Sequence, residues 1–462
     1  MTGSLSGKRI VTGALPLIAL ALALWPPGGL TTAQGQALGI VVLTIGLWAT
    51  NALPNYLPVL IFFAVVLIAR LAPPDAVFAG FGSAAVWLIV SGFVIGTAIG
   101  TSGLGARLAA AVGPVLTGSY PRLIGGLMAL AMALGFVMPS SVGRAVVLVP
   151  IGMALADRCG LARGSKGRQG VATVLAVGCN MPSFAILPSN IPNMILAGAA
   201  ETIHGVSFGY TDYLLLHYPV LGIAKAAVTV ALVLWLFPDQ VRPTSAAEAA
   251  AAAPGTRALQ WRTGLILLGT LALWMTDSLH GINPAWVGIA TAVLLLLPRV
   301  GVVDPQAFRG AVDFGTVLFV AGALALGSLV HASGLGTMIG HALERLLRLA
   351  PGQDALNFLS LSAMAFLTGL VSTVSGVPAV LTPLAPELAQ LSGFSLQAVL
   401  MTQVIGFSTV VFPYQIAPLV VAMQLSGERV SALTRLTLPL ALATFVLLLP
   451  LDYLWWVLIG AI

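Results

Sequence analysis

Two polar kinks within long apolar stretches carry the residue types best suited to binding chemistry. The first is MPSSVGRA at 138–145, which offers Ser140 and Ser141, and the second is VSTVSGVPA at 371–379. The hydroxyl groups of the second kink belong to Ser372, Thr373 and Ser375. A helix is expected to begin at each kink, and a helix N-terminus exposes unpaired N–H donors and the positive end of its dipole. Two such ends meeting would bind an anion, although the same residues would also serve as helix caps.

Arg144 follows the first kink inside an apolar stretch. An arginine inside a bilayer is costly and usually functional, and its planar guanidinium can hold a carboxylate or a sulfate through two parallel hydrogen bonds. The alternatives are that Arg144 extends to the cytoplasmic surface or pairs with a backbone carbonyl. Lys225 lies in another apolar segment and could neutralise an anion or extend to the surface. We expect no Asp or Glu within the membrane, which argues against a carboxylate proton relay.

Each kink is followed along the chain by an apolar segment that prolines interrupt. ILPSNIPNMIL at 186–196 offers Asn190 and Asn193, and FPYQIAPLVV at 412–421 offers Gln415. Freed carbonyls beside amide oxygens suit a desolvated cation such as Na⁺, whereas the N-terminus of a half-helix suits an anion. Prolines also kink membrane helices without any function, but two kinks at matching places are less readily explained in that way.

The composition indicates what kind of scaffold must position these residues. Of the 462 residues, 58% are hydrophobic and 7% are charged, whereas soluble domains carry about 25% charged residues. This excludes a soluble protein. The net charge of +6 comes from 20 Lys and Arg, which fall in short loops and therefore indicate membrane topology rather than nucleic-acid binding. The two cysteines, Cys159 and Cys179, lack metal-ligand spacing, so we expect neither a disulfide nor structural zinc.

Apolar segments bounded by Pro, Gly or charge predict an all-α polytopic membrane protein with about eleven transmembrane helices. The segments are 10–28, 36–53, 55–71, 84–101, 170–200, 213–237, 260–276, 285–299, 314–333, 396–424 and 432–460. Two further stretches, 121–156 and 354–391, contain the polar kinks, and we predict that they are re-entrant hairpins. Their tips should line a protein-buried or watered cavity, because unpaired backbone groups in hydrocarbon cost several kcal/mol each.

An internal repeat relates the two halves of the chain. AVWLIVSGFVIGTAIGTSGLG at 85–105 aligns without a gap with TVLFVAGALALGSLVHASGLG at 316–336, and each copy continues as hairpin, broken helix and final helix. Five predicted crossings separate the two starts, so the copies are inverted, as in many secondary transporters. The predicted divisions are N-terminal scaffold helices 1–83, a first repeat 84–237, a cytoplasmic linker 238–257, connecting helices 258–313 and a second repeat 314–462.

The basic residues predict the orientation of the chain in the membrane. With a cytoplasmic N-terminus, fifteen Lys and Arg fall on the cytoplasmic side and three outside, while Arg144 and Lys225 lie within the membrane. We therefore expect a multi-pass protein of the inner (plasma) membrane. The run from Ile10 to Trp25 also has features of a secretory signal, but the topology requires it as the first helix.

This arrangement resembles the divalent anion/sodium symporter family, within the ion transporter superfamily. The resemblance extends from about residue 36 to the end of the chain and includes the tip PSSVGRAVVLVPI followed by SNIPNMILAG. In that family each hairpin tip carries Ser-Asn-Thr and each broken helix carries a Thr-Pro-Pro-Asn-like turn. The matching positions here are Ser140-Ser141-Val142, Thr373-Val374-Ser375, Asn190-Ile191-Pro192-Asn193 and Ile416-Ala417-Pro418-Leu419. Both tip asparagines are absent, and the second turn lacks its Asn.

The resemblance implies a site for substrate carboxylates and two sodium ions. The residues then expected to bind substrate are Ser140, Ser141, Arg144, Asn190, Asn193, Thr373, Ser375 and Gln415. Sodium, the only cofactor implied, would lie near Ser140, Ser141, Ser189, Asn190, Ser372 and Thr373. The departures from the motifs favour the anion function over sodium coupling. A buried Arg144 beside the first sodium position could replace one cation, which would give a sodium-independent exchanger or a proton-coupled carrier.

We therefore predict a secondary active transporter of a small anion, such as a dicarboxylate or sulfate, that works by elevator-type alternating access as a homodimer. The early helices and 260–333 would form the scaffold, and the hairpins with 170–237 and 396–460 would move. Within transport, the alternative is a carrier for arsenite or citrate–metal. From another class, the alternative is an intramembrane serine protease using Ser333 or Ser375, but His331 is too close to Ser333 along a helix to share its face.

Overall fold

The computed structural model describes residues 3–50, 53–105, 107, 111, 115–241, 256–335 and 349–462, where helices are joined by turns and loops and no strand occurs. This confirms the predicted all-α class. Each of the eleven predicted apolar segments coincides with a helix or a broken helix. Among the described residues, seven helices are long and apolar enough to cross a membrane, or eight if one bent pair counts as a span. Residues 242–255 of the predicted linker and Gly336 of the repeat lie outside the described ranges.

One group of helices, here called the scaffold body, shares a hydrophobic core built around α5 and α17. Its elements are α1 (Gly3–Leu24), α2 (Thr32–Thr50), α3 (Tyr56–Ile68), α4 (Pro74–Phe78), α5 (Ala84–Ser102), α13 (Arg257–Met275), α14 (Asp277–His280), α15 (Pro284–Leu296), α16 (Pro305–Ala311) and α17 (Phe314–Ala332). The side chains of Ser83 and Asp313 accept hydrogen bonds from the first N–H groups of α5 and α17, which fixes where these two apolar helices begin.

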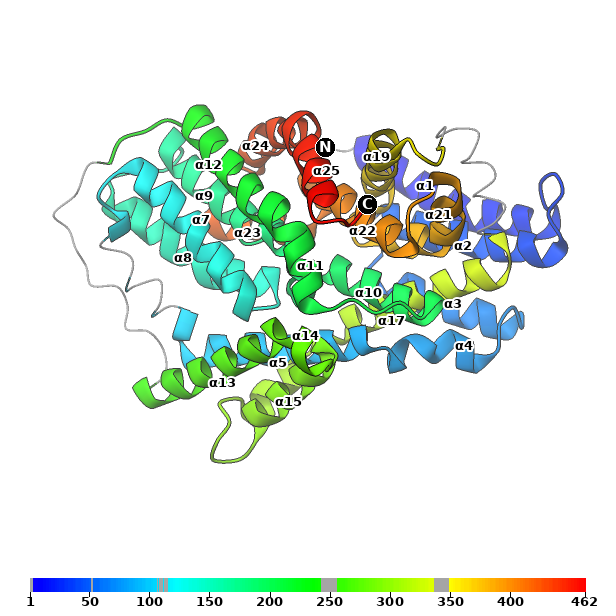
Figure 1. Cartoon of the computed structure of the whole chain (residues 1–462), viewed down its shortest axis with the longest axis horizontal. Helices are drawn as coiled ribbons and strands as arrows, with labels where there is room; N and C mark the ends of the chain where they lie inside the picture. The colour runs from blue at the N-terminus through cyan, green and yellow to red at the C-terminus, as the bar shows by residue number, and fades with distance from the viewer. Residues whose placement is uncertain are drawn as a thin grey trace.

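The remaining helices, here called the hairpin body, share a second hydrophobic core. Its elements are α7 (Tyr120–Val137), α8 (Ser141–Arg158), α9 (Lys166–Gly178), α10 (Ile191–His204), α11 (Tyr210–His217), α12 (Lys225–Leu236), α19 (Asp354–Ser372), α20 (Gly376–Leu381), α21 (Ala385–Ser392), α22 (Leu396–Phe407), α23 (Ala417–Ser426), α24 (Val430–Ala443) and α25 (Leu449–Leu458). In Figure 1 the helices α7, α8, α9 and α12 lie above the layer formed by α5, α13 and α15.

Helix α10 lies between the two cores. Its residues Leu196 and Ala200 belong to the core of the hairpin body, whereas Met194, Ile195 and Ala199 belong to the core of the scaffold body. It packs against α5 and α17 on the scaffold side and against α20 on the hairpin side. The contact between the bodies therefore runs along a helix that follows directly from the first break.

Helices α19 and α22 pack so closely that Gly406 has no room for a side chain. A Cβ at this position would lie 2.3 Å from the Cβ of Ala365 and 2.6 Å from the backbone nitrogen of Phe366. In helix α13, by contrast, Gly269 is exposed and has nothing within 4 Å of an added Cβ.

These two glycines should respond oppositely to the same substitution. Gly269→Ala should raise the thermal stability of the purified protein slightly, because Ala favours a helix interior over Gly by about 1 kcal/mol. Gly406→Ala should lower it, because the backbone of α19 must shift to make room. Melting curves in detergent measure both, and an equal response of the two variants would show that α19 and α22 are not in close contact.

Candidate functional site

The first hairpin joins α7 and α8 through the three residues 138–140. Ser140 is the N-cap of α8, and its Oγ accepts a hydrogen bond of 3.0 Å from the backbone N–H of Gly143. Ser141 begins the helix and is buried. The predicted polar tip is therefore present, and it ends in a helix N-terminus of the kind that binds anions.

Arg144 lies behind this tip and is completely buried. Its Nε donates to the carbonyl of Cys179 at 2.9 Å, and its two terminal nitrogens donate to Ser141 Oγ at 2.9 Å and to Ser189 Oγ at 2.8 Å. The same two nitrogens also donate hydrogen bonds to the carbonyls of Met138 and Ser189. A guanidinium has five N–H donors, and five hydrogen bonds engage them here. Arg144 therefore neither extends to the surface nor offers a free fork to a ligand.

The first break separates α9 from α10 and consists of two short 3-10 turns, Met181–Ala185 and Leu187–Ser189. Asn193 holds these turns together, because its Nδ2 donates to the carbonyls of Ser183 and Ile186 at 3.2 and 3.0 Å. Asn190 donates to Ser183 Oγ at 3.0 Å. Asn193 is fully buried, so its amide shapes the break instead of facing the ligand that the sequence suggested for it.

The second tip and the second break contact each other directly. The backbone N–H of Val374 donates to the carbonyl of Gln415 at 3.3 Å, and Gln415 Nε2 donates to the carbonyl of Gly369 at 3.3 Å. Gln415 Oε1 accepts from Val411 and Phe412, both at 2.8 Å. Gln415 therefore stabilises the turn between α22 and α23 and ties it to the second hairpin.

Thr373, at the second tip, has a backbone φ of +67°. This region is uncommon for residues other than glycine and is unfavourable for a β-branched side chain. The neighbouring Ser372 donates its hydroxyl to the carbonyl of Thr368 at 2.9 Å. Thr373 and Ser375 are both half-buried. The second tip is thus a strained turn whose hydroxyls at 373 and 375 lie near the surface.

At both breaks, the C-terminal end of the preceding helix contacts a buried cationic side chain. Cys179 is the C-cap of α9 and accepts from Arg144, while Ser408 is the C-cap of α22 and its carbonyl accepts from Lys225 Nζ at 2.8 Å. The C-terminal end of a helix carries partial negative charge, and half-helix ends of this kind hold the coupling cations of many transporters. In this chain each end already contacts a protein cation.

The sequence reasoning missed one charged residue. Asp452 lies in the second half of the last broken segment, in α25, and is 0% exposed, which corrects the expectation that no carboxylate is buried in the membrane. The charge of Lys225 acts on it. The signal in the sequence is a single Asp in the run LLLPLDYLWW, which belongs to the predicted apolar segment 432–460.

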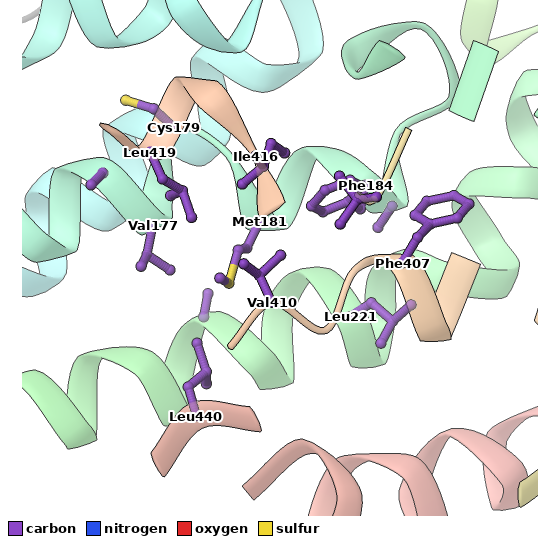
Figure 2. Close-up of a cluster of buried hydrophobic side chains, with 14 of the residues drawn as sticks. Val177, Cys179, Met181, Phe184, Leu221, Phe407, Val410, Ile416, Leu419 and Leu440 are labelled. Atoms are coloured by element: carbon purple, nitrogen blue, oxygen red, sulfur yellow. The ribbon is translucent and has the colours of Figure 1, made fainter. Parts of the chain in front are cut away.

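The two breaks pack against each other in the hairpin body. Figure 2 shows Met181 and Phe184 of the first break beside Val410 and Ile416 of the second. The ring centroids of Phe184 and Phe407 lie 5.6 Å apart. The half-helix α23 also packs on α8 and α9, while α10 packs on α20 of the second hairpin. The half-helix that follows each break therefore packs on helices that belong to the other tip or break.

Three helix N-termini meet at one cavity of about 290 Å³. Ser141 begins α8, Ile191 begins α10, and Pro418 is the second residue of α23, and all three line the cavity. Its remaining lining includes the polar groups of Ser140 and Asn190, residues of α5, and Asp313, the exposed N-cap of α17, whose carboxylate accepts hydrogen bonds from Gly315 and Thr316. The full set is Ile89, Gly92, Phe93, Pro139, Ser140, Ser141, Val142, Asn190, Ile191, Met194, Asp313, Thr316 and Pro418. Because a water takes about 30 Å³ in the liquid, a small anion fits.

The cavity brings together part of the predicted site. Ser140, Ser141 and Asn190 line it. Arg144 lies directly behind it, through its bond to Ser141. Thr373, Ser375, Asn193 and Gln415 are not among its lining residues. In this conformation these four residues do not line the cavity, so their contact with substrate stays a prediction. The side-chain amides of Asn193 and Gln415 form hydrogen bonds that stabilise the two breaks.

Comparison with known proteins identifies the family. Residues 7–462 match the family described as "Sodium:sulfate symporter transmembrane region", and the chain belongs to this family of membrane transporters. It is 25% identical over 86% of its length to a membrane protein of Cupriavidus necator, of which the match covers 81%. It is 23% identical over 73% of its length to the putative malate transporter YflS of Bacillus subtilis, of which the match covers 74%.

A solved structure confirms the fold class. The crystal structure of the YdaH transporter of Alcanivorax borkumensis superimposes with a TM-score of 0.53, covering 87% of this chain and 89% of the other at 17% identity. At this identity the likeness concerns the fold alone. Together with the apolar helices, the family establishes a multi-pass membrane transporter, as the sequence predicted.

Arg144 should be essential for the stability of the tip even without ligand. Arg144→Met keeps the unbranched apolar stem of the side chain but leaves five acceptors without their donor, and breaking a buried charged network typically costs about 3–5 kcal/mol. We expect a clearly lower melting temperature in detergent, measured against Arg163→Met, whose arginine is exposed. An unchanged melting temperature in Arg144→Met would mean that these hydrogen bonds do not hold the hairpin to the break.

Proposed function

We propose that this protein is a carrier of small divalent anions and that the cavity at the first tip is its substrate site. The observation that carries the proposal is the convergence of the N-termini of α8, α10 and α23 on one cavity. The N-termini of α8 and α10 contribute N–H donors and partial positive charge, whereas α23, which lines the cavity through Pro418 and offers no N–H there, contributes partial positive charge alone. The name of one relative, a putative malate transporter, and the sulfate in the family description support dicarboxylates and sulfate as the substrate class.

We further propose that anion binding does not require sodium. The oxygen atoms that would hold a sodium ion behind the first tip include Ser141 Oγ and the hydroxyl and carbonyl of Ser189, and all of these accept hydrogen bonds from Arg144. Arginine keeps its charge at every pH that a protein experiences. It therefore supplies the positive charge at this position permanently. Sodium coupling, which the family description suggests, is the alternative that the experiments below distinguish.

The two separate hydrophobic cores support an elevator mechanism. The hairpin body carries the second tip and most of both breaks on its own core, whereas Met138 of the first tip and Ile186 of the first break pack in the core of the scaffold body. In this proposal the hairpin body moves along α5 and α17 and carries the anion with it, in keeping with the predicted division of the chain. The homodimer, the inner-membrane location and the cytoplasmic N-terminus belong to the same proposal and follow from the resemblance and the charge distribution.

Transport by purified protein in liposomes tests the substrate class and the role of Arg144 together. Wild-type protein should take up radiolabelled sulfate, malate or succinate equally well in sodium and in choline. Arg144→Thr should lose roughly 10- to 150-fold in apparent affinity or become sodium-dependent, because losing the charged group that holds the tip to the first break typically costs about 1.5–3 kcal/mol. Arg144→Lys should recover only part of the loss, because an ammonium lacks the planar fork.

Two outcomes would contradict the proposal in different ways. Wild-type uptake of none of the three anions would exclude the proposed substrate class. Wild-type uptake that requires a sodium gradient would exclude Arg144 as the permanent cation but leave the anion site intact. Arg163→Thr is the matched control, since it removes an exposed arginine from the loop between α8 and α9.

A cross-link between the bodies tests the elevator. A Cβ at Gly96 of α5 would lie 3.9 Å from the Cβ of Ser140 at the first tip, which is within the range of about 3.5–4.5 Å found in disulfides. The double variant Gly96→Cys with Ser140→Cys should lose uptake on oxidation and regain it on reduction. Both single variants serve as controls, because the native Cys159 and Cys179 are buried. Unchanged uptake by fully cross-linked protein would show that the tip does not move relative to α5.

A further inference from the structure

A buried acid–base pair lies in the hairpin body away from the anion cavity. Asp452 of α25 is 0% exposed and Lys225 of α12 is 2% exposed. Neither oxygen of the Asp452 carboxylate has a hydrogen-bond partner. A buried ionised carboxylate without partners is very unfavourable, so this group must either carry a proton or receive a donor that is now bound elsewhere.

Lys225 is the donor that is bound elsewhere. Its ammonium group donates to the carbonyl of Ser408 at 2.8 Å and approaches Ser408 Oγ at 3.5 Å. The Lys225 ammonium and the Asp452 carboxylate are within electrostatic range of each other, but no ion pair within 4.0 Å joins them among the described residues. An ammonium has three donors on a flexible stem, so the group that now binds Ser408 is not fixed in one direction by its own geometry.

The other groups around Asp452 do not supply its proton or its countercharge. On α11, which packs against α25, the buried His217 directs Nε2 at the sulfur of Met401 at 3.3 Å, and its ring lies against Trp456 with centroids 5.8 Å apart. Tyr213 of α11 is buried and donates to the carbonyl of Phe184. The indole Nε1 of Trp456 also has no hydrogen-bond partner and acts on the carboxylate as a neutral donor, which supplies no countercharge.

The remaining charged and titratable groups on the elements packed against α25 are Asp212 of α11 and Asp354 of α19, both exposed, the half-buried Tyr218, and the buried Tyr210 at the start of α11. Lys225 is therefore the only cation among them that acts on Asp452.

The backbone around the pair departs from regular helix on both sides. A π-helical segment, η4 (Tyr218–Ala224), ends immediately before Lys225, and another, η7 (Thr444–Leu448), ends four residues before Asp452. The two segments contact each other. Such π segments are rare and are found frequently at functional sites. Lys225 and Asp452 thus each follow a departure from regular helix, and the two irregular segments are in contact.

We propose that Asp452 and Lys225 form a proton-binding site that couples proton uptake to anion transport. When Asp452 carries a proton, it is neutral, and Lys225 donates to the C-terminal carbonyl of α22 at the second break. When the proton leaves, the Asp452 carboxylate attracts Lys225 away from Ser408. Only one O–H bond forms or breaks, at Asp452, and the ammonium keeps its proton throughout.

The charge of the hairpin body changes by one unit between these two states. The protonated state has a net charge of +1 on the pair, and the deprotonated state has none, so the added positive charge should favour an anion in the cavity at the first tip. By thermodynamic linkage, anion binding must favour protonation to the same extent. This coupling rests on the proposed anion-carrier function, whereas the proton site itself does not.

Infrared titration of purified protein without any anion tests the proton site alone. Wild-type protein should show a protonated carboxyl band that disappears as the pH rises, and Asp452→Asn should lack this band. Asp304→Asn, which removes an exposed N-cap carboxylate, should keep it. Lys225→Met should retain the band to higher pH, because the positive charge that favours the carboxylate is gone. A wild-type band that is absent, or that stays constant between about pH 5 and pH 9, would overturn the proposal.

Transport of sulfate, whose charge does not change in this range, tests the coupling. An inward proton gradient should drive sulfate accumulation by wild-type protein, with apparent affinity roughly tenfold higher at the acidic end. Asp452→Asn should exchange sulfate across the membrane but should neither respond to pH nor accumulate it. If no anion is transported but the band titrates and is lost in Asp452→Asn, the anion function fails while the proton site stands. If wild-type sulfate exchange is independent of pH, the coupling is overturned.

Discussion

The hydrogen bonds of Arg144 are the interaction on which the rest of the site depends. Two breaks in membrane helices leave carbonyl groups that neither water nor lipid satisfies, and such groups are tolerated only where protein or a watered cavity surrounds them. At the first break Arg144 satisfies these groups, because it donates hydrogen bonds to the carbonyls of Cys179 and Ser189 and to the hydroxyls of Ser141 and Ser189. The tip of the first hairpin is thereby attached to the break, and the N-termini of α8 and α10 are held at one cavity.

The second break meets the same constraint with different residues. Lys225 donates to the carbonyl at the end of α22. The side-chain amide of Gln415 accepts a hydrogen bond from a backbone N–H of the turn and donates another to the second hairpin. The halves are therefore alike in architecture but unequal in chemistry, since an arginine keeps its charge permanently and a lysine beside a buried carboxylate need not hold one position. This inequality is what allows one end of the site to fix the anion and the other to respond to protons.

The sequence predicted the positions of the helices, hairpin kinks and breaks because prolines, glycines and apolar runs act locally. It also identified Ser140, Ser141 and Asn190, which line the cavity. It could not show that Arg144 uses all its donors within the protein, because the acceptors at 179 and 189 come close only in the folded chain. For the same reason Asn193 and Gln415 looked like ligand contacts, although their amides satisfy freed carbonyls. Asp452 was overlooked because a lone Asp in an apolar run has no partner nearby in sequence, and its partner Lys225 lies more than two hundred residues earlier.

Equilibrium binding of radioactive sodium to the purified wild-type protein tests the central claim most directly. If Arg144 and Lys225 supply the positive charges at the two breaks, wild-type protein should bind no sodium in a saturable manner, with or without sulfate or malate present. Arg144→Thr, which opens the oxygen atoms behind the first tip, is the variant in which saturable sodium binding should emerge. Saturable sodium binding by wild-type protein that strengthens when the anion is added would contradict the account, because the cation would then be a bound ion and not a side chain.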